Sequence, residues 1–217
     1  MRASAAGITR TTDAVETLSA PPPQGGARSP RRYPVELIDV LELRGGRRIT
    51  VRPVLPQDGP VLQAFVRHLS AESRRQRFLG SMSELPTALL DRLTRIDYCS
   101  HLALVAEFFP DGVETVIAEA RYALEPGDDG AEFAVAVADE WQRSGLATEL
   151  LRRLWAHSVA AGIGRLNAVS LDTNECMIRF ARKSGFTITR MAESPGLLRF
   201  RLESAPPAAG RLGNARW

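Results

Sequence analysis

The spacing of apolar residues along the chain alternates between strand-like and helix-like runs. In EFAVAVADEWQRSGLATELL, residues 132–151, apolar residues alternate up to Ala138 and recur every three or four positions after Gly145. This change predicts a strand that leads through a polar junction into a helix over residues 146–160. The next run, GRLNAVSLD, is strand-like again. Strand, helix and strand therefore predict a right-handed crossover between two parallel strands.

Before this crossover, the residue pattern predicts a hairpin, three helices and an antiparallel meander. Alternating branched residues on either side of Gly45 and Gly46 are typical of a β-hairpin. Ser70 is a suitable N-cap for the second helix, which covers AESRRQRF. Helical or strand-like spacing predicts helices over residues 57–70, 71–78 and 86–93 and strands over residues 101–109, 114–124 and 132–137.

After the crossover, the residue pattern predicts one helix and then two strands at the end of the domain. NECMIRFARKS is helical in spacing and ends next to Gly185, and residues 186–203 contain two strand-like runs with a loop between them. The fold class is therefore α/β, with a mixed central sheet flanked by helices. We expect one domain over residues 34–203, a disordered Pro- and Gly-rich leader over residues 1–33 and a flexible tail over residues 204–217.

Charge and cysteine content exclude several classes of function. The net charge of +3 is concentrated in the leader and the tail, which carry +3 and +2, so residues 34–203 carry −2. We expect no nucleic-acid partner, because the body has no basic recognition surface. The sequence has neither a membrane-spanning run nor a signal peptide, so we expect a cytoplasmic protein without a membrane partner. Cys99 and Cys176 lack metal-site spacing and are interpreted as buried free thiols, and we expect no metal.

The polar junction has the chemistry of an anion site. The first turn of a helix leaves backbone N–H groups without partners and concentrates partial positive charge. Gly145 allows a close approach to this backbone, and Arg143 adds a full charge. The sequence has neither a P-loop nor a GxGxxG motif, so a metal-free diphosphate carrier remains. The amides expected to bind it belong to Gln142, Arg143, Ser144, Gly145, Leu146, Ala147 and Thr148.

Two stretches resemble the GNAT acetyltransferase superfamily. VADEWQRSGLATELL is similar to its Q/R-x-x-G-x-G/A acyl-CoA motif, and NECMIRFARKSGF is similar to its second motif. LSAESRRQRFLG and HLALVAE further resemble the catalytic domains of bacterial protein lysine acetyltransferases. The resemblance implies the GNAT fold and acetyl-CoA as co-substrate. It also implies that the backbone of Val135–Val137 pairs with the pantetheine arm beside a splayed strand pair or a bulge, and that Asn174 faces the pantetheine or the thioester.

Acetyl transfer to an amine needs a base, because only about one lysine in 2,500 is neutral at pH 7. Glu132 is the first candidate: it matches the general base of the resembled enzymes and shares strand parity with Ala134 and Ala136. Glu119 on the neighbouring strand is the second. Many GNAT enzymes place a tyrosine acid seven residues after the motif Asn, but this position is Ala181, so no general acid is assigned.

The resemblance favours protein lysines as the acceptors, with an acyl-CoA synthetase as a candidate partner. Two alternatives stay open: a small-molecule amine as the acceptor, and a module that senses acetyl-CoA without turnover. Arg74, Arg75 and Arg77 lie where superfamily members shape the acceptor cleft, but a solvated helix face is the expected role. The histidines have no nucleophile at triad spacing, so a hydrolase is not expected.

Overall fold

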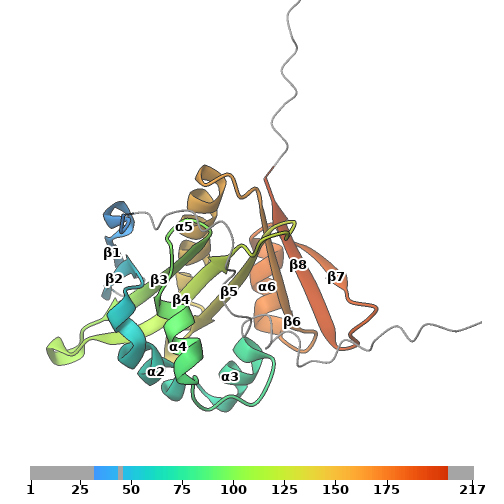
Figure 1. Ribbon diagram of the computed structural model, residues 1–217. Helices are drawn as coiled ribbons and strands as arrows, with labels where there is room; N and C mark the ends of the chain where they lie inside the picture. The colour runs from blue at the N-terminus through green and yellow to red at the C-terminus, as the bar shows by residue number, and fades with distance from the viewer. Residues whose placement is uncertain (1–31, 44–45, 205–217) are drawn as a thin grey trace, which may run out of the picture.

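The computed structural model describes residues 32–43 and 46–204. An eight-stranded sheet runs through them in the order β1-β2-β3-β4-β5-β6-β8-β7 (Figure 1). Every pair of neighbouring strands is antiparallel except β5 and β6, which are parallel. The strands are β1 Asp39–Glu42, β2 Arg48–Pro53, β3 His101–Phe108, β4 Thr115–Ala123, β5 Ala131–Val137, β6 Arg165–Leu171, β7 Thr187–Arg190 and β8 Leu197–Glu203.

Side-chain caps begin two of the helices, and a glycine follows the end of one of them. The Ser70 hydroxyl accepts a hydrogen bond from the Ser73 amide at 3.2 Å, and Asn174 caps α6 in the same way. Gly185, just after α6, has a φ of 84°, which an L side chain rarely adopts. The α-helices are α2 Gly59–His68, α3 Ala71–Phe78, α4 Thr87–Thr94, α5 Leu146–Ala160 and α6 Glu175–Lys183, and the 3₁₀ helices are η1 Val35–Leu37, η2 Pro56–Asp58, η3 Pro110–Gly112 and η4 Asp139–Trp141.

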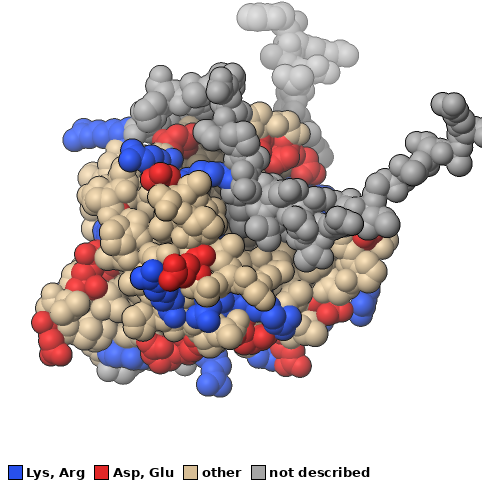
Figure 2. All heavy atoms as spheres, turned by 60° about the horizontal axis from the view of Figure 1, so that its bottom comes forward, with Lys and Arg blue, Asp and Glu red and all other residues tan. Residues whose placement is uncertain are grey.

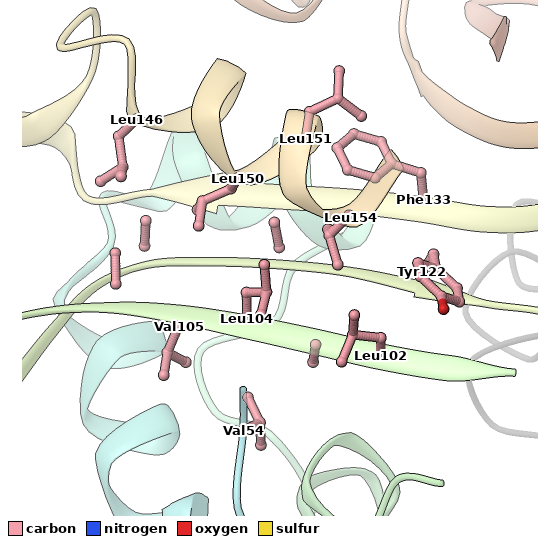
Figure 3. Close-up of a cluster of buried hydrophobic side chains, with 14 of the residues drawn as sticks. Val54, Leu102, Leu104, Val105, Tyr122, Phe133, Leu146, Leu150, Leu151 and Leu154 are labelled. Atoms are coloured by element: carbon pink, nitrogen blue, oxygen red, sulfur yellow. The ribbon is translucent and has the colours of Figure 1, made fainter. Parts of the chain in front are cut away.

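Helices cover both faces of the sheet, with α5 on one face and α2 and α4 on the other (Figure 1). Leu150 and Leu154 on α5 point toward the strands and are fully buried, and Leu104 of β3 points back at them (Figure 3). Truncating such a side chain to Ala costs about 2–5 kcal/mol. This packing fixes the position of α5, and with it the junction that leads into the helix.

Strands β5 and β6 are paired only at their first residues. The parallel register joins Ala131 to Leu166 and Glu132 to Asn167, while the strands continue to Val137 and Leu171 without further pairing. The strands therefore splay apart at their carboxyl ends. The GNAT resemblance implied either a splayed strand pair or a bulge, and the structure shows the splay at β5 and β6.

The predicted α/β class, the meander and the crossover are confirmed. The hairpin is shorter than expected, because Val35–Leu37 forms a 3₁₀ turn in place of a strand. Tyr33 donates a hydrogen bond to the Pro53 carbonyl and Ser204 donates one to the Gly164 carbonyl, so both residues contact the body. The rest of the predicted leader and tail lies outside the described residues. In the part of the chain that the structure describes, no helix is long and apolar enough to span a bilayer.

Candidate active site

A cavity of about 1020 Å³ occupies the splay between β5 and β6. Its walls include consecutive residues of β5 from Glu132 to Val137, which point alternately to the two faces of the sheet. The cavity therefore passes through the sheet from the α5 face to the face that carries α2, α3 and α4. Both the junction and α3 border it.

The junction, which we call the amide loop (residues 142–148), has an uncommon backbone. Arg143 has a φ of 62° and Gly145 a φ of 91°, so two of the three residues 143–145 have left-handed backbone. Alternating backbone of this kind turns successive N–H groups to the same side and forms an anion-binding concavity. The left-handed Arg143 also costs free energy, because only glycine adopts this conformation without strain.

Four amides of the loop face no protein acceptor within the described residues: those of Arg143, Ser144, Gly145 and Ala147. The Thr148 amide bonds to the Gly145 carbonyl at 3.1 Å, and the Leu146 amide approaches the Ser144 hydroxyl at 3.4 Å. A Cβ built on Gly145 would meet no protein atom within 4 Å. The loop thus presents donors and an open space to the cavity, which fits a diphosphate.

Contacts of Trp141 and Ser144 hold the amide loop in place. Before it, Trp141 is buried against Phe108 with a ring separation of 5.0 Å, and the guanidinium of Arg47 lies over the indole at 4.0 Å. Trp141 therefore packs the start of the loop onto the body. The Ser144 hydroxyl also donates to the Trp141 carbonyl at 2.6 Å. The loop is therefore preorganised by the protein itself.

A carboxylate connects the region before the loop to α3. Asp139 accepts hydrogen bonds from the Ser70 amide at 2.9 Å and from the Ser70 and Ser73 hydroxyls at 2.8 Å. These bonds hold the pKa of Asp139 below its usual range, although its partial burial acts in the opposite direction. The Gln142 amide group extends the connection to the Ser73 hydroxyl at 3.3 Å. The two sides of the cavity are thus linked by polar bonds.

Val135 and Val137 have no strand partner on the side of the splay, and the Val137 carbonyl accepts a hydrogen bond from the Gln142 side-chain amide at 3.4 Å. The Ala138 amide donates to the Ile117 carbonyl on β4 at 2.8 Å, so alternation turns the backbone groups of Val137 and Val135 away from β4 and toward β6. The β5–β6 ladder has already ended there. An extended amide-containing chain could therefore pair with these groups as an added strand.

Asn174 reaches the cavity wall, but its side chain is engaged in the fold. Its Oδ1 accepts from the Met177 amide at 3.0 Å, and its Nδ2 donates to the Ser170 hydroxyl at 3.1 Å. It therefore starts α6, whose first turns line the cavity with Cys176, Met177 and Phe180. Cys176 is exposed, so the expectation that both thiols are buried was wrong for this residue.

Glu132 lines the cavity at the point where the ladder ends, on the face that carries α3. Its carboxylate has no hydrogen-bond or ion-pair partner among the described residues. Burial raises the pKa of Glu132, the charges of Asp128 and Glu125 raise it further, and the charge of Arg77 lowers it. A largely buried carboxylate that opens onto a cavity is suited to accept a proton.

Glu119 lies outside this cavity and is occupied. Its two carboxylate oxygens contact the guanidinium groups of Arg121 at 2.5 Å and Arg77 at 3.4 Å, and its side chain is 6% exposed. Both oxygens of this carboxylate are therefore already in contact with arginines. The structure therefore brings Glu132 and every predicted cofactor residue to one cavity, but not Glu119.

The face around α3 contains residues that the sequence did not identify. Arg77 was expected on a solvated helix face, but its side chain is 6% exposed. The loop before β5 adds Asp128 and Asp129, and β8 adds Arg199 and Arg201. Hydropathy spacing could not have found them, because the topology alone brings these distant segments together. Figure 2 shows acidic and basic side chains side by side on the surface around α2, α3 and α4.

Known proteins agree with this architecture. Acetyltransferase PA5475 of Pseudomonas aeruginosa is 33% identical over 147 residues, which cover 68% of this chain and 79% of that protein. Acetyltransferase Pat of Mycolicibacterium smegmatis is 31% identical over 152 residues, covering 67% of this chain and 43% of that protein. The chain thus spans less than half the length of this Pat. The crystal structure of the GNAT domain of S. lividans PAT superposes with a TM-score of 0.72 at 28% identity, covering 80% of this chain and 100% of that domain.

The model of the acetyltransferase (GNAT) family matches residues 66–186, which include α3, the amide loop and α6. This match covers more than half of the chain and contains the two stretches on which the resemblance rested. The protein belongs to the acetyltransferase (GNAT) family.

Proposed function

We propose that the protein transfers the acetyl group of acetyl-CoA to the ε-amino group of protein lysines, with Glu132 as the general base. One observation carries the proposal: the unpartnered Glu132 carboxylate and the open amide loop line the same cavity, in the splay between β5 and β6. This arrangement lets the two reactants meet within one cavity.

The residues that would hold acetyl-CoA follow from its chemistry. Its diphosphate suits the open amides of Arg143, Ser144, Gly145 and Ala147, with the Arg143 side chain as an added charge. Its pantetheine amides suit the backbone of Val135 and Val137. Gln142, Leu146, Thr148 and Asn174 shape these two sites and are proposed as cofactor-binding through their positions on the same wall.

Acetyl-CoA supplies the acetyl group as an activated thioester. The acceptor arrives mainly as an ammonium ion and must lose a proton before nitrogen can attack the carbonyl carbon. Glu132 takes this proton, directly or through a water molecule, and the nitrogen–carbon bond forms as the carbon–sulfur bond breaks. The raised pKa of Glu132 makes it a stronger base than a solvated glutamate while it remains ionised.

A dedicated acid for the departing thiolate is not part of the proposal. The position where many relatives carry tyrosine is Ala181, which is fully buried and does not line the cavity. A CoA thiolate is a tolerable leaving group near neutral pH, because free thiols have a pKa of about 8.5. Proton transfer from water is therefore sufficient.

The acceptor side supports a protein substrate. The cavity there is bordered by partly exposed Arg199 and Arg201 and by the exposed loop residues Asp128 and Asp129, so a broad surface surrounds Glu132. The acidic loop also suits a cationic amine. The family relationship to Pat-type acetyltransferases points in the same direction, and an acyl-CoA synthetase is the proposed partner class.

The test is CoA release from acetyl-CoA by the purified protein, with an acetate-activating acyl-CoA synthetase and a panel of free amines as parallel acceptors. Mass spectrometry locates the acetylated residues. We expect release with the synthetase and modification of a defined lysine. Turnover with free amines alone would move the function to a small-molecule acetyltransferase. Tight binding of acetyl-CoA without turnover on any acceptor would instead leave a sensing module.

A further inference from the structure

Arg77 has an unusual position for an arginine on a short surface helix. Its side chain is 6% exposed and borders two cavities: the large one that contains Glu132, and a small one beneath it lined by Glu119, Arg121 and Ala136. Its guanidinium also lies 5.1 Å from the ring of Phe78. The helix therefore directs a permanent positive charge into the protein, next to the proposed base.

Arg77 belongs to a buried charge cluster, which we define as Arg77, Glu119 and Arg121. Nε of Arg121 is 2.5 Å from Oε1 of Glu119, and Nη2 of Arg77 is 3.4 Å from Oε2 of the same residue. Arg121 is further fixed by the Leu93 carbonyl at 3.2 Å. Two positive charges thus share one carboxylate, so the cluster carries one excess positive charge.

The sheet register places this cluster on the same face as Glu132. Glu119 lies opposite Ala136 and Arg121 opposite Ala134, and these alanines share a face with Glu132. Both alanines have small side chains. Arg77 and Glu132 line the same cavity on this face.

Glu132 needs such a counter-charge. The groups that face it are acidic Glu125 and Asp128 on the loop before β5, Arg77 on α3, neutral Asn167 on β6 and Arg201 on β8. Arg201 is already engaged with Asp129 and Asn167. Burial and the two acidic neighbours favour the neutral carboxyl group, which could not accept a proton. Arg77 provides the opposing charge.

We propose that Arg77 is a positioning residue that holds the Glu132 carboxylate ionised and oriented for proton abstraction, and that the Glu119–Arg121 pair fixes Arg77 for this role. The proposal rests on the proposed function of Glu132 as the base. Arginine suits this role because it stays charged at every accessible pH. Glu119, the second candidate for the base, then acts through Arg77 instead of accepting a proton.

The test is the titration of Glu132 in the free protein, followed by NMR of ¹³C-labelled glutamate carboxyl groups and assigned with Glu132→Gln. In Arg77→Met we expect the midpoint of the Glu132 titration to rise by about one pH unit. An opposite charge within about 4–6 Å of a carboxyl group lowers its pKa by about 1–3 units. Removing Arg77 leaves the Glu119–Arg121 pair neutral, so the fold should persist. Arg77→Gln serves if the methionine variant does not fold.

Two variants separate this role from a structural one. Arg77→Lys keeps the charge and should restore the midpoint, whereas Arg75→Met removes an exposed arginine of the same helix, paired with Glu72, and should leave it unchanged. A midpoint in Arg77→Met or Arg77→Gln equal to that in Arg75→Met would overturn the proposal. The titration needs neither acceptor nor turnover, so its outcome is independent of whether acetylation is observed. If the proposed function holds, the acidic limb of kcat/KM shifts by the same amount.

Discussion

Glu132 and Glu119 lie on the same face of neighbouring strands, yet their surroundings give them different chemistry. Two arginines neutralise Glu119, whereas Glu132 has no bonded partner within the described residues and opens onto a cavity. The pKa of Glu132 is raised by burial first and by Glu125 and Asp128 in addition. The proposed base therefore works at the edge of a low-dielectric region.

A second buried carboxylate, Glu107, gives a prediction for stability. Burial and a hydrogen bond with Glu114 raise its pKa to about 7, against the opposing effect of Arg52. Its folded pKa exceeds the unfolded value, so its contribution is fully present below the unfolded pKa and is lost as pH rises through about 7. Glu107→Gln has no carboxyl group at this position, so its free energy of unfolding lacks this decrease as pH rises.

We expect the free energy of unfolding of Glu107→Gln, relative to the wild type, to increase by about 1–2 kcal/mol between pH 5 and pH 8, after allowance for screening. Urea unfolding at several pH values measures it. Glu193→Gln, which removes an exposed carboxylate paired with Arg199, is the control and should show no such trend. An equal trend in both variants would exclude the role of Glu107.

The family resemblance and strand parity together predicted Glu132 as the base candidate, and its neighbours Ala134 and Ala136 are local in sequence. The pairing of Glu119 was not predictable, since Arg77 lies 42 residues away on another element. The exposure of Cys176 was not predictable either, because it depends on the cavity that the sheet and α6 form together.

At the scale of elements, the junction between β5 and α5 contains most of the residues that we propose to bind the cofactor. Periodicity predicted α5 with the bounds that the structure shows, and the glycine at its start marked the open backbone. The splay of β5 and β6 followed from the family resemblance, since a hydropathy pattern contains no information on where a ladder ends. The connection through Asp139 joins residues 69 positions apart and left no local pattern.

Gly145→Asp should weaken acetyl-CoA binding by about 100-fold or more, equivalent to roughly 3 kcal/mol. The new side chain would occupy the open space at the amides and repel the diphosphate. Isothermal titration calorimetry measures the dissociation constant.

Gly162→Asp provides the matched control. Gly162 has a φ of 81° and no protein atom within 4 Å of a built Cβ, so the substitution introduces comparable backbone strain beyond the end of α5 and outside the cavity. We expect its acetyl-CoA affinity to equal that of the wild type. Equal losses in both variants would attribute the effect to strain and refute our placement of the diphosphate.

At the scale of the whole molecule, Tyr33 packs against the body although it lies next to the Pro- and Gly-rich leader. The ring of Tyr33 packs edge-on against Tyr98 at 5.5 Å, and its hydroxyl bonds to the Pro53 carbonyl at 3.0 Å. The flanking Pro and Arg residues gave no apolar pattern that would have assigned Tyr33 to the body.

A chain of residues 32–204 should therefore unfold with nearly the free energy of the full chain. Beginning the chain at Pro34 should lower the free energy of unfolding by about 1–3 kcal/mol, which is the sum of one ring contact and one hydrogen bond. Urea unfolding compares the chains, and Tyr33→Phe isolates the hydroxyl. If residues 34–204 prove as stable as residues 32–204, Tyr33 contributes nothing to the body.

The central claim is that Glu132 removes the proton from the acceptor amine. The most direct measurement compares kcat and the acetyl-CoA dissociation constant between the wild type and Glu132→Gln, with the acceptor that gives the highest rate. We expect kcat to fall by about two to four orders of magnitude while the dissociation constant stays unchanged. A loss of less than about tenfold at all pH values would contradict the account and assign proton removal to water or another group.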